Sequence, residues 1–319
     1  MVQAGPVPRA AAAVVALLTT IAVGMVSPAG ASAVKASAKG RQVDIGGGRK
    51  LYLRCAGSGS PTVVLESGIH DSSDPWTITD TKPPVPASPS VFAGLAQVTR
   101  VCLYDRPGTI RYDKPEPHIT ARSTPVDNPR TLDAQAADLA AVLARGKVPG
   151  PYLLVAHSYG GMIVRRYAQQ HADRVAGIVF VDAFAPTIKP LFGELWPQYE
   201  ELLNHPGLAL DQDPTWETVD ADEAIATLDA GPALPSLPYA VVSKALPFGV
   251  APTAPADVVA RLEQAWPQVQ DAIAKEVGTS QPPHVIATGS DHYVQLHDPD
   301  LVIATVEVVM DRIAAGRHK

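Results

Sequence analysis

Short apolar runs recur along the chain and alternate with stretches that have helical spacing. Runs such as Thr62–Glu66 (TVVLE) and Tyr152–Ala156 (YLLVA) have no polar face, which is typical of strands that are covered on both sides. Eight runs are predicted as strands: Arg41–Ile45, Lys50–Arg54, Thr62–Glu66, Arg100–Asp105, Tyr152–Ala156, Gly177–Asp182, Tyr239–Ser243 and Pro283–Ala287.

Helical patterns lie between these runs. In Thr131–Arg145 the apolar residues recur at spacings of four, three and four, which is one face of a helix. Tyr159–His171 follows a strand directly, Pro255–Val277 is a long helix with a polar face, and the last helix begins at Pro299 and ends at Gly316. This alternation predicts an α/β fold: an eight-stranded, mostly parallel sheet with helices on both faces.

Two segments do not fit the alternation. Thr81–Ser90 is a proline-rich loop, and Ala183–Leu237 is a long excursion between two predicted strands. An excursion of this length is typical of a cap or lid, and its aromatic content argues against disorder. We therefore expect a helical lid over residues 183–237. Its aromatic residues are Phe184, Phe192, Trp196, Tyr199 and Trp216.

The segment Ala156–Gly161 (AHSYGG) stands where a predicted strand passes into a predicted helix. A serine in such a sharp turn is held outward above the strand ends, where its hydroxyl can attack a carbonyl. The crowded turn needs small residues two before and two after the serine, and Ala156 and Gly160 meet this need. The pattern predicts Ser158 as a catalytic nucleophile.

A serine nucleophile needs a general base, and His292 is the best placed of the nine histidines. It follows the last predicted strand and precedes the C-terminal helix, at the edge of the sheet where Ser158 is expected. His157 adjoins the nucleophile but should point away from it, as a structural residue. His70 follows the TVVLE strand, where a structural role competes with contact to substrate.

The third catalytic group should be a carboxylate that orients the imidazole. No acid follows the seventh predicted strand until Asp257, whereas Asp182 ends the strand beside the nucleophile strand. We therefore assign the acid to Asp182, with Asp257 and Asp291 as alternatives; Asp182 would otherwise only cap a loop.

An oxyanion hole requires two backbone N–H donors. One is expected from Tyr159, directly after the nucleophile, at the positive end of the helix dipole. The other is expected from Ser67–His70, the turn after TVVLE, where Gly68 permits a tight bend and the Ile69 N–H is favoured.

These motifs resemble those of α/β-hydrolase fold proteins, over nearly all of the chain from TVVLESG at 62 to GSDHYVQLHDP at 289. The chain is most similar to an exported actinobacterial branch with a Tyr-Asp-Arg-Pro-Gly segment, here Tyr104–Gly108. The order Ser158, Asp182, His292 is the order of that family. The resemblance implies acyl transfer on a serine.

The sequence departs from the family pattern at three points. Ala156 replaces a glycine, and Ser67 stands where many members have histidine. The acid after the seventh strand is missing, as in members that carry it after the sixth. No catalytic group is lost.

The resemblance also predicts where the two cysteines, Cys55 and Cys102, lie relative to each other. In the family the second strand runs antiparallel beside the fourth, which would place the two residues opposite each other within disulfide range. We expect a disulfide, with two buried free thiols as the alternative.

The N-terminus resembles an export signal. Arg9 precedes the apolar run Ala10–Val26, and Ala31-Ser32-Ala33 is a cleavage site of the A-x-A kind. We expect cleavage after Ala33, or alternatively after Ala31, and a secreted domain spanning residues 34–319. A membrane anchor is the other interpretation, but the run is near the lower limit for spanning ~30 Å of hydrocarbon.

Composition narrows the function. The net charge is −6 with no block of Lys or Arg, which gives no footprint for nucleic acid. The acidic stretch Asp211–Glu223 lacks the spacing of a calcium loop and is expected to be a solvated face. No cofactor or metal is implied. The predicted activity is hydrolysis of an apolar acyl or aryl ester; an amidase or peptidase, or a non-catalytic ligand-binding protein of the same fold, are the alternatives.

Overall fold

The computed structural model of the protein describes residues 39–80, 88–277 and 284–316. The predicted export signal at 1–33 and most of the proline-rich loop lie outside these ranges. None of the helices within them is long and apolar enough to span a membrane.

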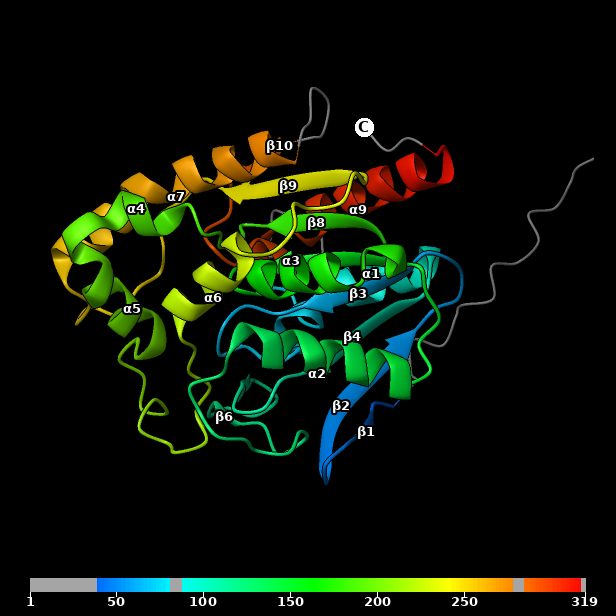
Figure 1. Cartoon of the computed structure of the whole chain (residues 1–319), viewed down its shortest axis with the longest axis horizontal. Helices are drawn as coiled ribbons and strands as arrows, with labels where there is room; N and C mark the ends of the chain where they lie inside the picture. The colour runs from blue at the N-terminus through cyan, green and yellow to red at the C-terminus, as the bar shows by residue number, and fades with distance from the viewer. Residues whose placement is uncertain (1–38, 81–87, 278–283, 317–319) are drawn as a thin grey trace, which may run out of the picture. The chain divides into compact units, whose positions relative to one another are not determined.

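One sheet of eight strands forms the centre of the fold, in the order β1-β2-β4-β3-β7-β8-β9-β10 (Figure 1). The first two pairs in that order, β1 with β2 and β2 with β4, are antiparallel, and all other neighbours are parallel. The predicted sheet is confirmed. Its strands are β1 (Arg41–Gly46), β2 (Arg49–Ala56), β3 (Thr62–Glu66), β4 (Val101–Asp105), β7 (Tyr152–His157), β8 (Val175–Val181), β9 (Tyr239–Lys244) and β10 (His284–Ala287); a separate pair consists of β5 (Ile110–Arg111) and β6 (His118–Ile119).

Helices cover both faces of this sheet. In β7, Leu154 packs into the cluster formed with α2, α3 and α7, while Leu153 and Val155 pack into the cluster formed with α1 and α9. Because alternate side chains of one strand enter two cores, the strand is apolar throughout. The helices are α1 (Val91–Val98), α2 (Leu132–Arg145), α3 (Gly160–Gln170), α4 (Ile188–Phe192), α5 (Trp196–Asn204), α6 (Ala221–Asp229), α7 (Ala256–Glu276), α8 (Val294–His297) and α9 (Pro299–Ala314).

Side-chain caps fix where several helices begin. Thr131 accepts a hydrogen bond from the Ala134 N–H at the start of α2, and Asp298 accepts one from Leu301 at the start of α9. Pro299 occupies the first turn of α9, where a missing N–H costs nothing. The predicted start of the C-terminal helix is therefore found where expected.

The two cysteines form a disulfide. Cys55 of β2 and Cys102 of β4 are register partners across the antiparallel ladder, with Cα atoms 4.1 Å apart. The bridge closes a loop with a sequence separation of 47. The predicted pairing is confirmed.

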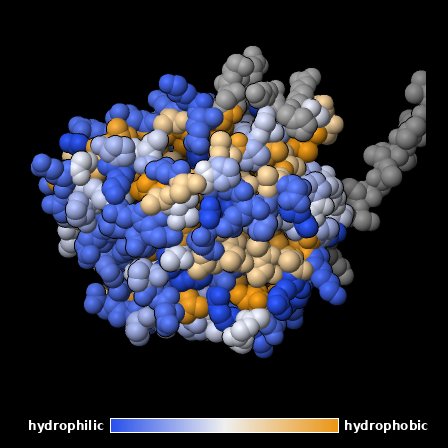
Figure 2. Space-filling view, viewed as in Figure 1, coloured by the Kyte–Doolittle hydropathy of each residue, from blue (hydrophilic) through white to orange (hydrophobic). Residues whose placement is uncertain are grey.

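Residues 183–237, here called the insertion, connect β8 to β9 and contain α4, α5 and α6. In Figure 1, α4 and α5 lie on the side toward which the arrowheads of β8 and β9 point. Phe192, Trp196 and Trp216 are buried, and Phe192 and Trp196 belong to the same core cluster as residues of β7, α2, α3 and α7. The surface seen in Figure 2 is mostly hydrophilic, with apolar residues in small groups.

Candidate active site

Ser158 occupies a strained turn between β7 and α3. Its φ of +50° is unusual for a residue with a side chain, and the surrounding structure must hold it there. The Ser158 N–H donates to the Val181 carbonyl at 3.2 Å, and the Ser158 carbonyl accepts from Gly161 at 2.9 Å and from Phe184 at 2.9 Å. These bonds fix the turn to both neighbouring elements.

The turn tolerates only small neighbours. A Cβ added at Gly160 would lie 2.6 Å from the Ser67 carbonyl oxygen, and one at Gly68 would lie 3.0 Å from Cβ of Ser158. The loop after β3 therefore lies directly against the serine, and glycine is required at both positions. Ala156 is completely buried within β7, where its methyl group is accommodated.

His292 is hydrogen-bonded to the carboxylate of Asp182. Nδ1 of His292 lies 2.6 Å from Oδ2 of Asp182, and Oδ1 accepts from the Lys244 N–H at 3.0 Å. Because a carboxylate only accepts hydrogen bonds, the proton of the neutral imidazole belongs on Nδ1, which leaves Nε2 as the acceptor. Asp182 is fully buried, with a φ of +43°.

The other two candidate carboxylates have different partners. Asp257 is exposed in the first turn of α7, where its carboxylate accepts from the Val258 N–H. Asp291 accepts from the Tyr293 N–H and contacts Nε2 of His297 at 2.9 Å. Of the three carboxylates considered, Asp182 is the one bonded to His292.

Aromatic rings enclose the imidazole of His292. Phe248 lies 4.7 Å and Trp266 lies 5.3 Å from it, between ring centroids. His157 is buried, and its Nε2 bonds the His292 carbonyl at 2.8 Å. Burial, and then the charge of His292, hold the pKa of His157 well below its ordinary value, so this ring is neutral. His157 thus anchors the loop that carries His292.

The backbone N–H groups of the two expected oxyanion donors are not used in the hydrogen bonds of a helix or a strand. Ile69 and Tyr159 lie outside helices and strands, and within the described ranges neither N–H donates to a main-chain carbonyl. Tyr159 is the N-cap residue of α3, where the orphan N–H groups and the helix dipole favour a negative charge.

A buried ionic cluster behind the loop after β3 was not predicted from the sequence. Arg106 contacts Glu66 at 2.7 Å and Glu217 at 2.7 Å, and all three side chains are essentially inaccessible to solvent. Burial raises the pKa of Glu66 to about 7. Burial also opposes ionisation of Glu217, but Arg106 outweighs it and lowers the pKa of Glu217 below its usual value.

The expectation of a solvated acidic face over 211–223 is wrong in part. Asp213, Asp220 and Asp222 are exposed, but Glu217 is fully buried because Arg106 compensates its charge. Among the described residues, no group of three potential ligand side chains is arranged to hold a metal ion.

A cavity of about 710 Å³ joins these groups, with Ser158 and His292 in its wall. Most of its lining is apolar and comes from the insertion, from the segment after β9 and from α7. Two carboxyl groups, those of Asp71 and the exposed Glu116, also line it. Asp71 is buried, which raises its pKa to about 7, and its Oδ1 accepts from the Tyr112 hydroxyl at 3.0 Å. The apolar side chains include Ile69, Leu202, Leu203, Phe248, Leu262 and Trp266.

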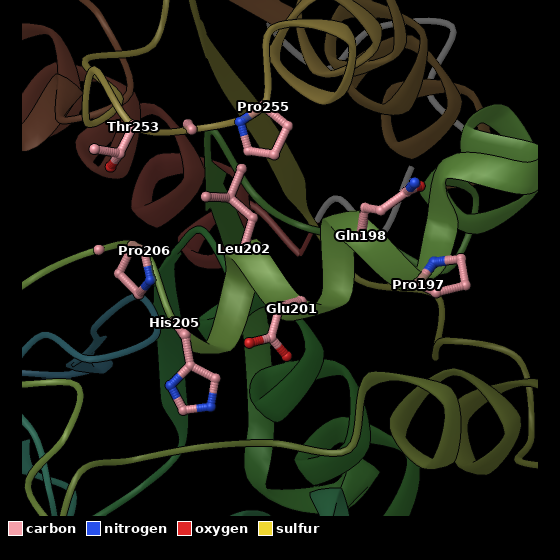
Figure 3. A pocket seen from close by; sticks show the side chains of 10 residues that line it. Pro197, Gln198, Glu201, Leu202, His205, Pro206, Thr253 and Pro255 are labelled. Carbon is pink, nitrogen blue, oxygen red and sulfur yellow. The ribbon is translucent and has the colours of Figure 1, made fainter.

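A second hollow of about 360 Å³ lies between α5 and the segment before α7. Figure 3 shows Gln198 and Glu201 of α5 on one side and Thr253 and Pro255 on the other. It contains none of the predicted site residues. Leu202 belongs to the walls of both spaces, so α5 separates the hollow from the cavity.

The strand order, the serine turn and the histidine at the carboxyl edge of the parallel strands are those of the α/β-hydrolase class. The chain belongs to the alpha/beta hydrolase fold family, whose family model matches residues 61–228.

Curated relatives match only part of the chain. An uncharacterized protein of Schizosaccharomyces pombe is 32% identical over 151 residues, which cover 42% of this chain and 26% of that protein. The uncharacterized protein YqjL of Bacillus subtilis is 29% identical over 126 residues, covering 40% of this chain and 41% of YqjL. The match thus spans less than half the length of either relative.

Solved structures match over most of the chain. An esterase from Thermogutta terrifontis is 17% identical with a TM-score of 0.52, covering 86% of this chain and 99% of that one. A putative aryl esterase from Burkholderia cenocepacia is also 17% identical, with a TM-score of 0.52 and coverage of 87% and 100%. At this identity the likeness concerns the fold.

Proposed function

We propose that the protein is a serine hydrolase that cleaves carboxylic esters through an acyl-enzyme on Ser158. The observation that carries the proposal is the 2.6 Å bond between His292 and Asp182, at a cavity whose wall also contains Ser158 in a strained turn. A carboxylate that fixes Nδ1–H leaves Nε2 free to accept the serine proton.

The chemistry then follows in two balanced halves. Oγ of Ser158 attacks the ester carbonyl while Nε2 of His292 takes the hydroxyl proton; the C–O bond breaks and the proton passes to the leaving alcohol. Water, deprotonated by the same nitrogen, attacks the acyl carbon; the bond to Oγ of Ser158 breaks, the proton returns from Nε2 to Oγ, and the carboxylic acid is released. Asp182 stabilises the imidazolium, and the N–H groups of Ile69 and Tyr159 stabilise the oxyanion.

The apolar lining of the cavity favours an ester with an apolar acyl or aryl group. A second candidate is an amidase or peptidase, because the Asp71 carboxyl in the cavity wall could hold a substrate ammonium group. Burial raises its pKa to about 7, so it is only partly ionised at neutral pH, and its Oδ1 already accepts from the Tyr112 hydroxyl; we therefore favour the ester.

We also propose that the protein acts outside the cytoplasm, as a member of the exported branch that its motifs resemble. The disulfide between Cys55 and Cys102 supports export, since such bonds persist in oxidising compartments. N-terminal sequencing of the protein from culture medium tests the expected cleavage after Ala33; an intact N-terminus in the cytoplasmic fraction would contradict it.

The catalytic proposal is tested by Ser158→Ala with p-nitrophenyl acetate, butyrate and octanoate and with a fluorophosphonate probe. The variant should fold, lose the label and lose about 10⁴ or more in kcat. Ser90→Ala, a buried serine that caps α1, is the matched control and should keep both. Activity of Ser158→Ala within tenfold of wild type refutes the nucleophile, and absence of labelling in the wild type favours a non-catalytic binding protein.

A further inference from the structure

Arg106 uses all five N–H groups of its guanidinium behind the loop that follows β3. Two go to the carboxylate of Glu217, at 2.7 and 2.9 Å, and one goes to Glu66 at 2.7 Å. The others reach main-chain carbonyls, Ser67 at 2.9 Å and Gly68 at 2.5 Å. A buried guanidinium thus holds two successive peptide groups of the loop.

The second of these peptides contains the expected oxyanion donor. The carbonyl of Gly68 and the N–H of Ile69 belong to one planar trans peptide group, so they point in opposite directions. Since Arg106 holds the carbonyl on one side, it sets the direction of the N–H on the other. The loop lies against the nucleophile at this point, as the 3.0 Å approach of an added Gly68 Cβ to Ser158 shows.

Glu217 holds the next peptide. Its Oε2 accepts the His70 N–H at 2.8 Å while it also accepts from Arg106. The residue before it, Trp216, stacks on the His70 ring at 4.1 Å between centroids. Trp216 and Glu217 belong to the insertion, so the insertion itself fixes the loop that carries the Ile69 N–H.

We infer that Arg106 and Glu217 are positioning residues that direct the Ile69 N–H toward the oxyanion of the ester reaction, so that the insertion controls the rate of acyl transfer as well as the fit of substrate. The inference rests on the proposed function. The positive charge of Arg106 at the Gly68 carbonyl also polarises this peptide group. The Ile69 N–H of the same group thereby becomes a stronger hydrogen-bond donor.

A misdirected oxyanion donor destabilises the transition state more than it destabilises the bound substrate. Loss of one donor lowers kcat by about 10²–10³, and misdirection should cost part of that, about 10- to 100-fold, with KM nearly unchanged. Glu217→Gln keeps the shape but replaces one accepting oxygen by an NH₂ group that faces other donors. Glu217→Asp keeps the charge but is too short to reach both Arg106 and His70.

The matched control is Asp138→Asn in α2, which breaks another buried ion pair, with Arg130 at 2.8 Å. Each variant is measured for unfolding temperature, kcat and KM on p-nitrophenyl butyrate, and inhibition by a trifluoromethyl ketone, whose tetrahedral adduct needs the oxyanion hole. We expect both Glu217 variants to lose kcat and ketone affinity in parallel, whereas Asp138→Asn should lose only thermal stability.

A Glu217 variant that folds and keeps kcat and ketone affinity within threefold of wild type overturns the inference, as does an equal kcat loss in Asp138→Asn. If Glu217→Gln does not fold, Glu217→Asp decides the result, because it leaves Arg106 neutralised. Failure of the proposed function is distinguishable: the wild type would then show no ester hydrolysis that depends on Ser158.

Discussion

Ser158, Asp182 and His292 each stand in a turn that follows a strand of the sheet, whereas the wall of the cavity comes from segments far apart in the chain. The first region is held by backbone bonds, such as Ser158 N–H to Val181 and Asp182 N–H to Val242. The second is held by side-chain packing, for example around Leu202 and Trp266. Strand-edge geometry is therefore fixed by topology, and the cavity wall by the particular side chains.

This difference predicts a division of roles. Changes at the strand edge should reduce the turnover of every ester alike, because those groups act on the reacting carbonyl. Changes in the wall should depend on the substrate, because the wall contacts only its acyl or alkoxy part. The contact between Arg106 and Glu217 links the two regions, because it joins the insertion to the loop that lies against the nucleophile.

The largest effect is expected at the acid. Asp182→Asn keeps the shape of the side chain but favours the wrong imidazole tautomer, and should lower kcat by about 10⁴ on acetate and octanoate esters alike. Steady-state kinetics on both esters measure this loss. Asp257→Asn, an exposed residue at the start of α7, should change kcat by less than twofold.

The opposite pattern, with Asp257 essential and Asp182 dispensable, would contradict the assignment. A loss at Asp182 that is confined to one ester would contradict the proposed division between the strand edge and the wall.

The next effect concerns stability alone. The disulfide joins β2 to β4 and neither cysteine lines the cavity, so replacing Cys55 and Cys102 together by alanine should leave kcat unchanged. Loss of a bridge with this loop length should lower the free energy of unfolding by ~4 kcal/mol. Urea unfolding of the oxidised wild type and the double variant measures it. A large fall in kcat in the folded variant would show that the site depends on this distant tie.

The strand edge could be predicted from the sequence because local patterns determine it. An apolar run followed by a helix places Ser158, and the absence of a carboxylate after Tyr239–Ser243 directs attention to Asp182. The bond between Asp182 and His292 then joins the segments that follow β8 and β10, the two strands on either side of β9.

The wall and the ionic cluster could not be predicted in this way. Glu217 is one of several acids in an otherwise polar stretch, and its burial depends on Arg106, which is 111 positions away in the chain. Phe248 and Trp266 likewise meet His292 only in three dimensions. The Tyr104–Gly108 segment indicates the resemblance to the family, but its sequence does not show which main-chain carbonyls its arginine binds.

A substitution in the cavity wall tests the comparison in the second region. Leu202→Ala should open the cavity toward the hollow of Figure 3 and remove apolar contact with long acyl chains. At ~0.8 kcal/mol per buried methylene, kcat/KM for the octanoate ester should fall about tenfold, while that for acetate should stay nearly constant. Leu191→Ala in α4, a partly buried leucine of the insertion, is the control. An equal loss on both esters would place Leu202 in the catalytic geometry instead.

The smallest effect is expected from Asp71, the buried carboxyl group of the cavity wall. Because burial raises its pKa to about 7, it is mainly neutral at pH 6 and mainly ionised at pH 8. The groups that influence it most do not change over that range: the pKa of Glu217 is lowered, and those of Arg106, Tyr112 and Tyr293 are raised.

For an ester that carries an ammonium group, kcat/KM should therefore rise relative to that of its neutral isostere as the pH increases through 7. The gain should be about fivefold in the ratio of their kcat/KM values, since a partly screened charge pair contributes ~1 kcal/mol. The ratio cancels the protonation of the catalytic base, which both substrates share, and Asp71→Asn should abolish its pH dependence. A gain of a hundredfold or more, together with cleavage of the corresponding amide, would instead identify Asp71 as an anchor for a substrate ammonium group and favour the amidase or peptidase. In that case the wall would determine the class of reaction as well as the choice among esters.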